Sequence, residues 1–442
     1  MNRRISFAVL ALVATVAHGD SNWPQWRGPD LNGVSGATGL PTTWSPSENI
    51  IWKAALPTWS GSSPIVWGEH VFITSPSATP TDAKPAVRRR LPGRMGGRSD
   101  PGGPDLLLFC FNARDGSLRW KKKLGSGNRL FGKHNMASPS PVTDGTRVVT
   151  MIGTGLVAAF DFDGKQLWQR DLAADYGEPA PAWGYGSSPI LYEGKVIVPV
   201  MHGSNTSTPS YVVALDIENG KTVWKVARKT DAARECPDAY TTPVISRHDG
   251  RTDLVILGAD YVTGHDPATG KEIWRAGGMN PEGRGNYRIV ASPVAVAGMI
   301  FTPTRQKPFL AFRAGGTGDV SESHRLWSFS KSAVPDVPTP VCDGKYLYMV
   351  NDRGIVACLD ARSGEVIWGP KRTAVGTVSA SPVLADGKLY ITNEVATTTV
   401  LQAGPEFKVL ATNKLNDAYT ISSMAVIDSR IFLRTSTHLL CI

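Results

Sequence analysis

The sequence lacks the motifs that mark several common reaction centres. Its 442 residues contain no C-x-x-C-H haem site, no H-E-x-x-H zinc site and no G-x-S-x-G nucleophile elbow. Long apolar runs are also missing, because the longest, Ile5 to Ala17, has 13 residues and a bilayer span needs roughly 20. Charged residues make up 19% of the chain and hydrophobic residues 41%. This balance excludes a disordered chain and predicts a folded protein without a transmembrane segment.

Cysteine is scarce. The five cysteines are an odd number with no adjacent pair, which argues against a full disulfide framework. A bridge between Cys236 and Cys342 stays open. Glycine and proline, in contrast, are spread along the whole chain, with 45 and 32 residues, and indicate many turns and few long helices. A single turn-rich β domain therefore fits better than several mixed domains.

The first residues have the pattern of an export signal. Arg3 and Arg4 precede the apolar run, and Ala17-His18-Gly19 is a small-x-small cleavage site, so residues 1–19 are predicted to be a signal peptide. No cysteine follows the run to accept a lipid. We expect a mature chain from Asp20, periplasmic or secreted, with residues 20–49 as an N-terminal extension.

An internal repeat dominates the rest of the chain. Each unit opens with Ser/Thr-Pro-aliphatic, and an eighth copy, Ser422-Ser423-Met424, lacks the proline. The copies begin at Ser63, Ser140, Ser188, Thr242, Ser292, Thr339 and Ser381. A turn and an alternating or aliphatic run follow each copy, which predicts a hairpin.

The second half of each unit has the pattern Asp-x3-Gly-x3-Trp. It is clearest at Asp216 to Trp224, Asp266 to Trp274 and Asp360 to Trp368. Glycine supplies the positive φ of a tight turn, and we expect the Trp to pack between neighbouring units. Three cysteines, Cys110, Cys358 and Cys441, occupy one repeat position where other units have Ala, so we interpret them as small buried packing residues.

Four short strands per unit at this spacing predict an all-β, eight-bladed β-propeller over residues 50–442. The last unit stops at Ile442 after its third strand, while Ile50 to Lys53 is a strand without a partner. Joining the two would complete the eighth blade and leave no free sheet edge.

The repeat resembles the pyrroloquinoline quinone (PQQ)-like propeller family. The resemblance rests on the Pro-aliphatic strand, the Asp-x3-Gly-Lys/Glu-x2-Trp turn and the count of eight, and Trp23-Pro24-Gln25-Trp26-Arg27-Gly28-Pro29 resembles the opening of many exported members. The family includes quinoprotein dehydrogenases and a non-catalytic subunit of the outer-membrane β-barrel assembly machinery. It implies the fold more firmly than the function.

The resemblance to quinoproteins implies one set of candidate residues. Trp183 would be the stacking face for the quinone, Arg288 or Arg305 its clamp, and Asp336 the catalytic base, while Asn393 and Glu394 would hold calcium. The two adjacent cysteines that such enzymes often carry are missing.

Loops that lead into the innermost strands are expected to meet at one mouth of the central channel. Their aromatic and polar side chains could hold a planar quinone, a sugar or a peptide strand, or merely line a water-filled funnel. The candidates for this ligand funnel are Trp59, His134, Tyr185, Tyr240, Tyr287 and Tyr419.

A basic Pro/Gly-rich insertion at residues 76–105 is the second candidate binding element. It has six cations and no acid between Lys84 and Arg98, which predicts a solvated loop. In an exported protein its acidic partners would be envelope surfaces or a partner protein rather than nucleic acid. The six are Lys84, Arg88, Arg89, Arg90, Arg94 and Arg98.

Two main functions follow from this pattern. The first is a monomeric, non-catalytic binding or scaffold module of the cell envelope, without a cofactor, that binds an envelope protein, a peptide segment or an anionic surface. The alternative is a dehydrogenase for an alcohol or sugar that uses PQQ with calcium. A glycan-binding propeller, with exposed stacked aromatics, is a third class.

Overall fold

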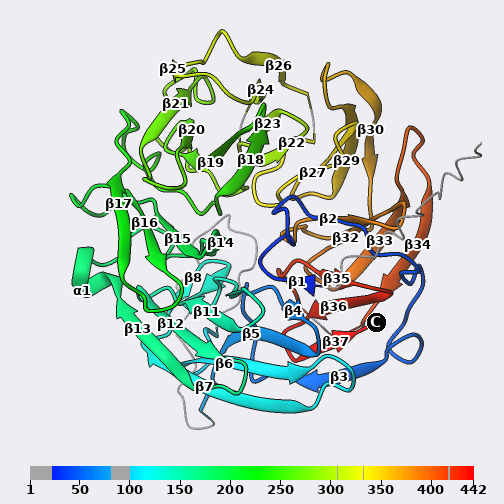
Figure 1. Cartoon of the computed structure of the whole chain (residues 1–442). Helices are drawn as coiled ribbons and strands as arrows, with labels where there is room; N and C mark the ends of the chain where they lie inside the picture. Colours follow the sequence, from blue (N-terminus) through cyan, green and yellow to red (C-terminus); the bar gives the residue numbers. More distant parts are fainter. Residues whose placement is uncertain (1–21, 81–99, 306, 332, 417–418) are drawn as a thin grey trace, which may run out of the picture.

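A computed structural model describes residues 22–80, 100–305, 307–331, 333–416 and 419–442. Eight antiparallel sheets of four or five strands stand around a central axis, which confirms the eight-bladed β-propeller (Figure 1). The first strands of neighbouring blades contact one another around the axis. The predicted signal peptide and all six cations of the basic loop lie outside the described residues.

Blades 1 to 4 follow in chain order, each with its first strand nearest the axis. Their strands are β4 (Ile65–Trp67), β5 (His70–Pro76), β6 (Asp105–Asn112) and β7 (Leu118–Ser126) in blade 1; β10 (Val142–Thr143), β11 (Arg147–Met151), β12 (Leu156–Asp161) and β13 (Gln166–Asp171) in blade 2; β14 (Ile190–Tyr192), β15 (Lys195–Val200), β16 (Tyr211–Asp216) and β17 (Thr222–Ala227) in blade 3; β18 (Val244–His248), β19 (Arg251–Gly258), β20 (Tyr261–His265) and β21 (Glu272–Ala276) in blade 4.

Blades 5 to 8 complete the ring. Their strands are β22 (Val294–Val296), β23 (Met299–Thr302), β24 (Phe309–Arg313) and β26 (Arg325–Phe329) in blade 5; β27 (Val341–Cys342), β28 (Tyr346–Val350), β29 (Ile355–Asp360) and β30 (Val366–Arg372) in blade 6; β31 (Val383–Ala385), β32 (Lys388–Thr392), β33 (Thr397–Gln402) and β34 (Val409–Lys414) in blade 7; β35 (Ala425–Ile427), β36 (Arg430–Arg434) and β37 (His438–Cys441) in blade 8.

Smaller elements lie outside this pattern. The helix of the described chain, α1 (Leu172–Tyr176), is capped by Asp171, and a short ribbon joins β8 (Leu130–Phe131) to β9 (His134–Asn135). No helix of the described residues is long and apolar enough to cross a membrane.

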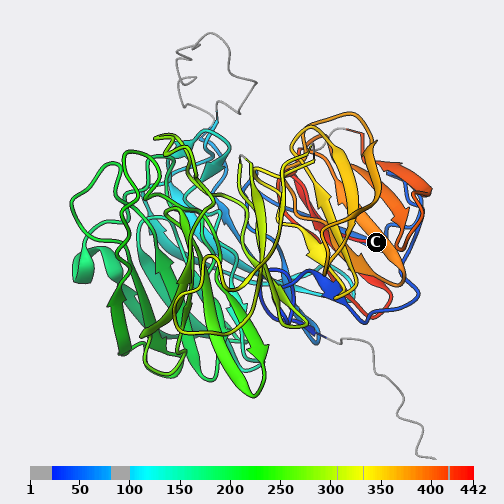
Figure 2. The same cartoon turned by 90° about the horizontal axis from the view of Figure 1, so that it is seen from above.

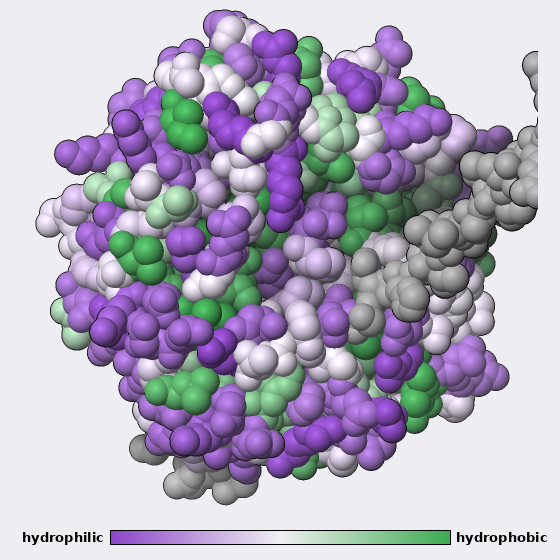
Figure 3. All heavy atoms as spheres, viewed as in Figure 1, coloured by the Kyte–Doolittle hydropathy of each residue, from purple (hydrophilic) through white to green (hydrophobic). Residues whose placement is uncertain are grey.

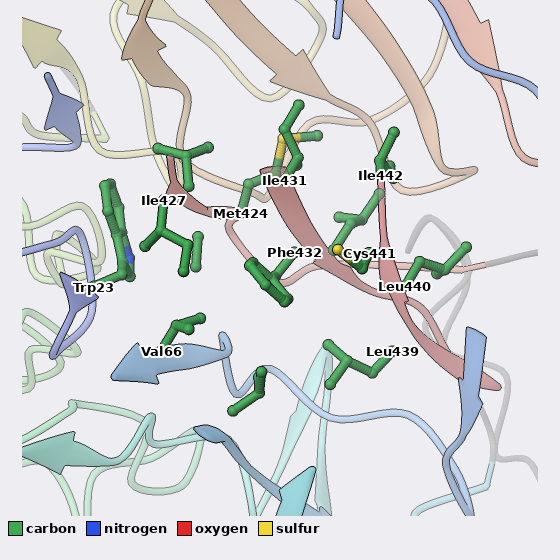
Figure 4. Packing of buried hydrophobic residues seen from close by; sticks show 14 of the residues in the cluster. Trp23, Val66, Met424, Ile427, Ile431, Phe432, Leu439, Leu440, Cys441 and Ile442 are labelled. Carbon is green, nitrogen blue, oxygen red and sulfur yellow. The ribbon is translucent and has the colours of Figure 1, made fainter. Parts of the chain in front are cut away.

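Blade 8 is closed by the N-terminal strand β3 (Trp52–Ala55), which pairs antiparallel with β37. Trp52 lies opposite Cys441 in this pairing. Around the seam, side chains of blade 8 pack against Val66 of blade 1 and against Trp23 from the N-terminal segment (Figure 4). The two ends of the chain are therefore held in one hydrophobic cluster.

The repeated Trp residues join neighbouring blades. The indole of Trp168 covers the turn of the next blade so closely that a Cβ on Gly220 would lie 2.6 Å from the ring. Its Nε1 donates to the carbonyl of Ile217, 2.8 Å away. Trp52, Trp120, Trp224, Trp327 and Trp368 make the same kind of bond to the following blade.

Trp274 is the exception, because the turn of the next blade is replaced by a longer loop. Its Nε1 donates instead to Asp253 of its own blade. The loop supplies β25 (Gly318–Asp319), which pairs parallel with β21 beside Trp274. An extra strand therefore covers the outer edge of blade 4.

The residues that open each repeat form a closed ring of hydrogen bonds around the axis, here called the Ser/Thr ring. The backbone N–H of Ser63 donates to Ser140 Oγ of the next blade at 2.9 Å, and the same bond recurs at every blade until Ser423 N–H donates to Ser63 Oγ at 3.0 Å. The intervening acceptors are Ser188, Thr242, Ser292, Thr339, Ser381 and Ser423. The last unit lacks the proline but keeps this hydroxyl.

The N-terminal extension closes one end of the axis and is called the N-terminal plug, residues 22–40. Its strand β1 (Asn22–Trp23) pairs with β4 of blade 1, and β2 (Val34–Ser35) pairs in parallel with β31 of blade 7. Figure 2 shows the plug, in blue, at one face of the propeller.

Between these two strands, Arg27 is fully buried. Its guanidinium donates to the carbonyls of Thr339, Pro340 and Pro382 in blades 6 and 7. The plug thus reaches the level of the Ser/Thr ring.

All five cysteines are buried and free, so the possible pair between Cys236 and Cys342 is not formed. Cys110 and Cys358 lie opposite the blade Trp residues in the strand register, as a small packing residue should. Burial raises the pKa of Cys110 to about 12, which makes its thiol a poor nucleophile at neutral pH.

Candidate functional site

The channel mouth lies at the end of the axis away from the plug. The plug contacts the chain at the ends of first strands, such as Thr143 and Leu191. The predicted funnel residues instead come from loops that precede first strands. The mouth and the plug therefore lie at opposite ends of the axis, with the Ser/Thr ring between them.

An ion pair spans the mouth between loops far apart in the sequence. Lys133 Nζ lies 2.7 Å from Glu394 Oε1, and the Ser379 hydroxyl donates to the same oxygen at 2.6 Å. The Glu394 side chain is only 12% exposed, so its charge is neutralised by protein groups rather than by solvent.

A second cluster surrounds Trp183. Its Nε1 donates to Glu235 at 2.8 Å, and Arg288 lies 3.4 Å from the same carboxylate. The Arg288 guanidinium also lies over the indole ring, 5.6 Å from its centroid. On the loop of Lys133, a Cβ on Gly132 would lie 3.6 Å from the indole. Trp183 is thus packed by protein groups.

Two half-buried acids complete the mouth. Arg305 lies 3.5 Å from Asp336, yet burial raises the pKa of that carboxyl. Burial and the charge of Asp336 raise the pKa of Asp352 to about 6, although the N–H of Val337 donates to it. Two neighbouring acids in a recess resist full ionisation together.

The expectation that the funnel aromatics present ring faces is wrong for three residues. Trp59, Tyr185 and Tyr287 are each at most 2% exposed. Their polar atoms donate to backbone carbonyls, Trp59 to Asp100, Tyr185 to Pro199 and Tyr287 to Lys307. Because their rings are buried in the packing between blades, these three residues support the loops.

The other three funnel residues are partly buried among aromatic neighbours. His134 stacks on Phe131 and meets Tyr240 edge to face, and burial lowers the pKa of its imidazole. Tyr419 meets Trp59 edge to face.

The side chains do not match the quinone and calcium arrangement in two respects. The amide of Asn393 donates to the carbonyl of Val375, and its oxygen accepts from the N–H groups of Val395 and Thr397, so it forms a turn. The ring of Trp183 is covered by Arg288. Among the described residues, no three His, Cys, Asp or Glu side chains gather to hold a metal.

The structure also shows residues that sequence reasoning missed. Lys133 and Glu235 complete the ion pairs of the mouth, and both lie in inter-blade loops whose neighbours, His134 and Tyr240, were candidates. A cavity of about 580 Å³ beside the mouth was not foreseen. Its lining comes from three blades, so no single stretch of sequence carries its pattern.

Over 301 residues the chain is 23% identical to outer membrane protein assembly factor BamB of Yersinia pestis, covering 66% of this chain and 65% of that protein. The match thus spans slightly less than two thirds of the relative's length.

Solved structures share the fold. BamB from Moraxella catarrhalis has a TM-score of 0.58 at 15% identity, covering 88% of this chain and 96% of that one. Quinohemoprotein alcohol dehydrogenase from Comamonas testosteroni has a TM-score of 0.62 at 10% identity, with 95% and 80% covered. A europium-containing methanol dehydrogenase has a TM-score of 0.64 at 11% identity, with 93% and 89% covered.

The fold and the mouth together define a plugged, eight-bladed PQQ-like propeller. Within this class, the family model described as outer membrane protein assembly factor BamB matches residues 105–370, more than half of the chain. The chain belongs to that family.

Proposed function

We propose that the protein is a non-catalytic binding and scaffold module of the cell envelope that holds a partner protein at the channel mouth. The supporting observation is that six charged side chains of the mouth form three ion pairs with one another. Glu394 is bound to Lys133, Glu235 to Arg288 and Asp336 to Arg305. A rigid set of paired charges suits recognition of a protein surface.

Family membership supports the same proposal, since the matched family is named for outer membrane protein assembly. The proposal implies that the protein is located in the cell envelope, which agrees with the predicted export signal. We propose a monomer that needs no cofactor. The basic loop would add attraction to anionic envelope surfaces.

The competing function is the PQQ-dependent dehydrogenase, favoured by the fold of the two dehydrogenase structures. Thermal melting of the mature protein with PQQ and calcium separates the two, because a ligand that binds the folded state raises the melting temperature. We expect no saturable shift and no dye-linked alcohol oxidation. A shift that requires both ligands would establish the dehydrogenase instead.

The scaffold itself is tested by capture of partners from envelope extracts. Glu235→Arg breaks the pairing at the mouth and should remove a partner that the native protein retains. Glu218→Arg is the matched control, since Glu218 is 70% exposed and only pairs with Arg147 at the outer rim. If both variants retain every partner, the mouth is not the binding surface.

A further inference from the structure

The cavity beside the mouth is strongly basic. It lies where the loop between blades 4 and 5 meets the loops of blades 5 and 6. Glu282 is the acidic residue of its lining, against five cations: Arg284, Arg305, Lys307, Lys331 and Arg353.

The acid does not neutralise this charge. Glu282 is paired with Arg284, and Arg305 is paired with Asp336 of the mouth. Lys307, Lys331 and Arg353 form none of the ion pairs found among the described residues. Three unpaired cations facing one recess repel one another and concentrate positive potential there.

The remainder of the lining suits a peptide. Ala333 and Val334 provide a small apolar surface, and the oxygen of Asn351 holds the turn that carries Arg353 by accepting the Arg353 N–H. The volume of about 580 Å³ is in the range of ligand clefts, and Lys307, Lys331 and Arg353 come from three different loops. Such a spread suits several carboxylates along a chain better than a single small anion.

From these observations we infer that the basic cavity binds an acidic segment of a partner protein, with Lys307, Lys331 and Arg353 pairing to its Asp or Glu side chains. The inference rests on the proposed function and names the chemistry of the partner. Arg305 links the cavity to the mouth through Asp336, so one partner can occupy both.

Binding of a labelled acidic peptide, an Asp/Glu-Gly-Ser decamer, to the mature protein tests this by fluorescence anisotropy. The Asn/Gln version of the peptide should not bind. Lys307→Gln with Lys331→Gln should weaken binding roughly tenfold, which corresponds to about 1.4 kcal/mol. Added salt should weaken binding of the native protein as well.

The matched control is Lys221→Gln with Lys408→Gln, which removes the same charge from exposed sites of blades 3 and 7. It should bind like the native protein. Equal weakening in both double variants would show attraction to net charge alone and overturn the inference. Competition by inorganic phosphate at equal ionic strength would indicate a small-anion site and overturn the peptide assignment.

Partner capture keeps the two proposals separate. If Glu235→Arg loses the envelope partner while the cavity variant retains it and binds the peptide normally, the scaffold function stands and the basic cavity is not its acidic subsite.

Discussion

At the scale of single residues, the hydroxyl before each proline has a more specific role than marking the start of a strand. It accepts the backbone N–H of the preceding blade, and the proline that follows brings no N–H of its own to the crowded axis. The eighth unit shows which residue matters, because Ser423 keeps the bond while the proline is lost. The sequence repeat predicts this position in seven units, but in the eighth it places it one residue early, at Ser422. It also does not reveal the partner, which belongs to another unit.

Replacement of one ring hydroxyl should therefore leave a buried donor without an acceptor. Ser140→Ala removes the acceptor of the Ser63 N–H, and both residues are at most 2% exposed. We expect a loss of about 1–3 kcal/mol in the free energy of unfolding, measured by urea denaturation.

Ser140→Thr is the matched control and should stay near the native value, because Thr242 and Thr339 already serve in the ring. Similar losses of unfolding free energy for Ser140→Ala and Ser140→Thr would mean that packing, and not the hydrogen bond, determines the change in stability.

At the scale of elements, the turn and the Trp are parts of one inter-blade contact. The Asp-x3-Gly-x3-Trp pattern was predictable from sequence because glycine and Trp recur at fixed spacing. What could not be predicted is that the Trp of one unit covers the glycine of the next, or that β25 replaces this contact at Trp274. Both depend on how whole blades are placed side by side.

The contact is tested by adding a single methyl group. Gly220 and Gly250 both have positive φ, 70° and 74°, but a Cβ on Gly220 would meet Trp168 at 2.6 Å whereas Gly250 has nothing within 4 Å. Gly250→Ala should cost about 1 kcal/mol for the backbone conformation alone. Gly220→Ala should cost about 1–3 kcal/mol more, because the methyl group overpacks the contact. Equal melting temperatures for the two variants would show that the indole simply moves aside.

At the scale of the whole molecule, the fold was predictable and the plug was not. Eight repeats and a spare strand dictate a closed ring. Residues 22–40 carry no repeat, so apart from the opening pattern around Arg27 nothing in the sequence predicted their path along the axis. The mouth was predicted in part. Trp183 contacts Arg288, and Arg305 pairs with Asp336. Asn393 is used in a turn instead, because a residue type alone does not reveal whether its polar atoms are already bonded.

Arg27 should be the main anchor of the plug. Burial lowers the pKa of its guanidinium to about 9, so it is a buried cation at neutral pH, stabilised by backbone carbonyls. Arg27→Met leaves those carbonyls unsatisfied and should cost about 3 kcal/mol. It should also speed protease cleavage within residues 22–40.

Arg247→Met is the control, because its 4.0 Å pair with Asp30 is mostly exposed. It should change stability by less than about 1 kcal/mol. If the Arg27 variant is cleaved only as slowly as the native protein, strands β1 and β2 hold the plug without the cation.

The path of the plug also fixes an order of events in time. Residues near Arg27 are synthesised early, but the carbonyls that accept from Arg27 belong to Thr339, Pro340 and Pro382, far along the chain. Strand β3, which contains Trp52, likewise cannot pair until strand β37 with Cys441 has been synthesised. Strand β1 can pair with β4 of blade 1 early, but the guanidinium of Arg27 and strand β3 must stay unpaired until almost the whole chain has been synthesised. Arrival of blades 6 and 7 completes the contacts of the plug, and the last blade closes the ring.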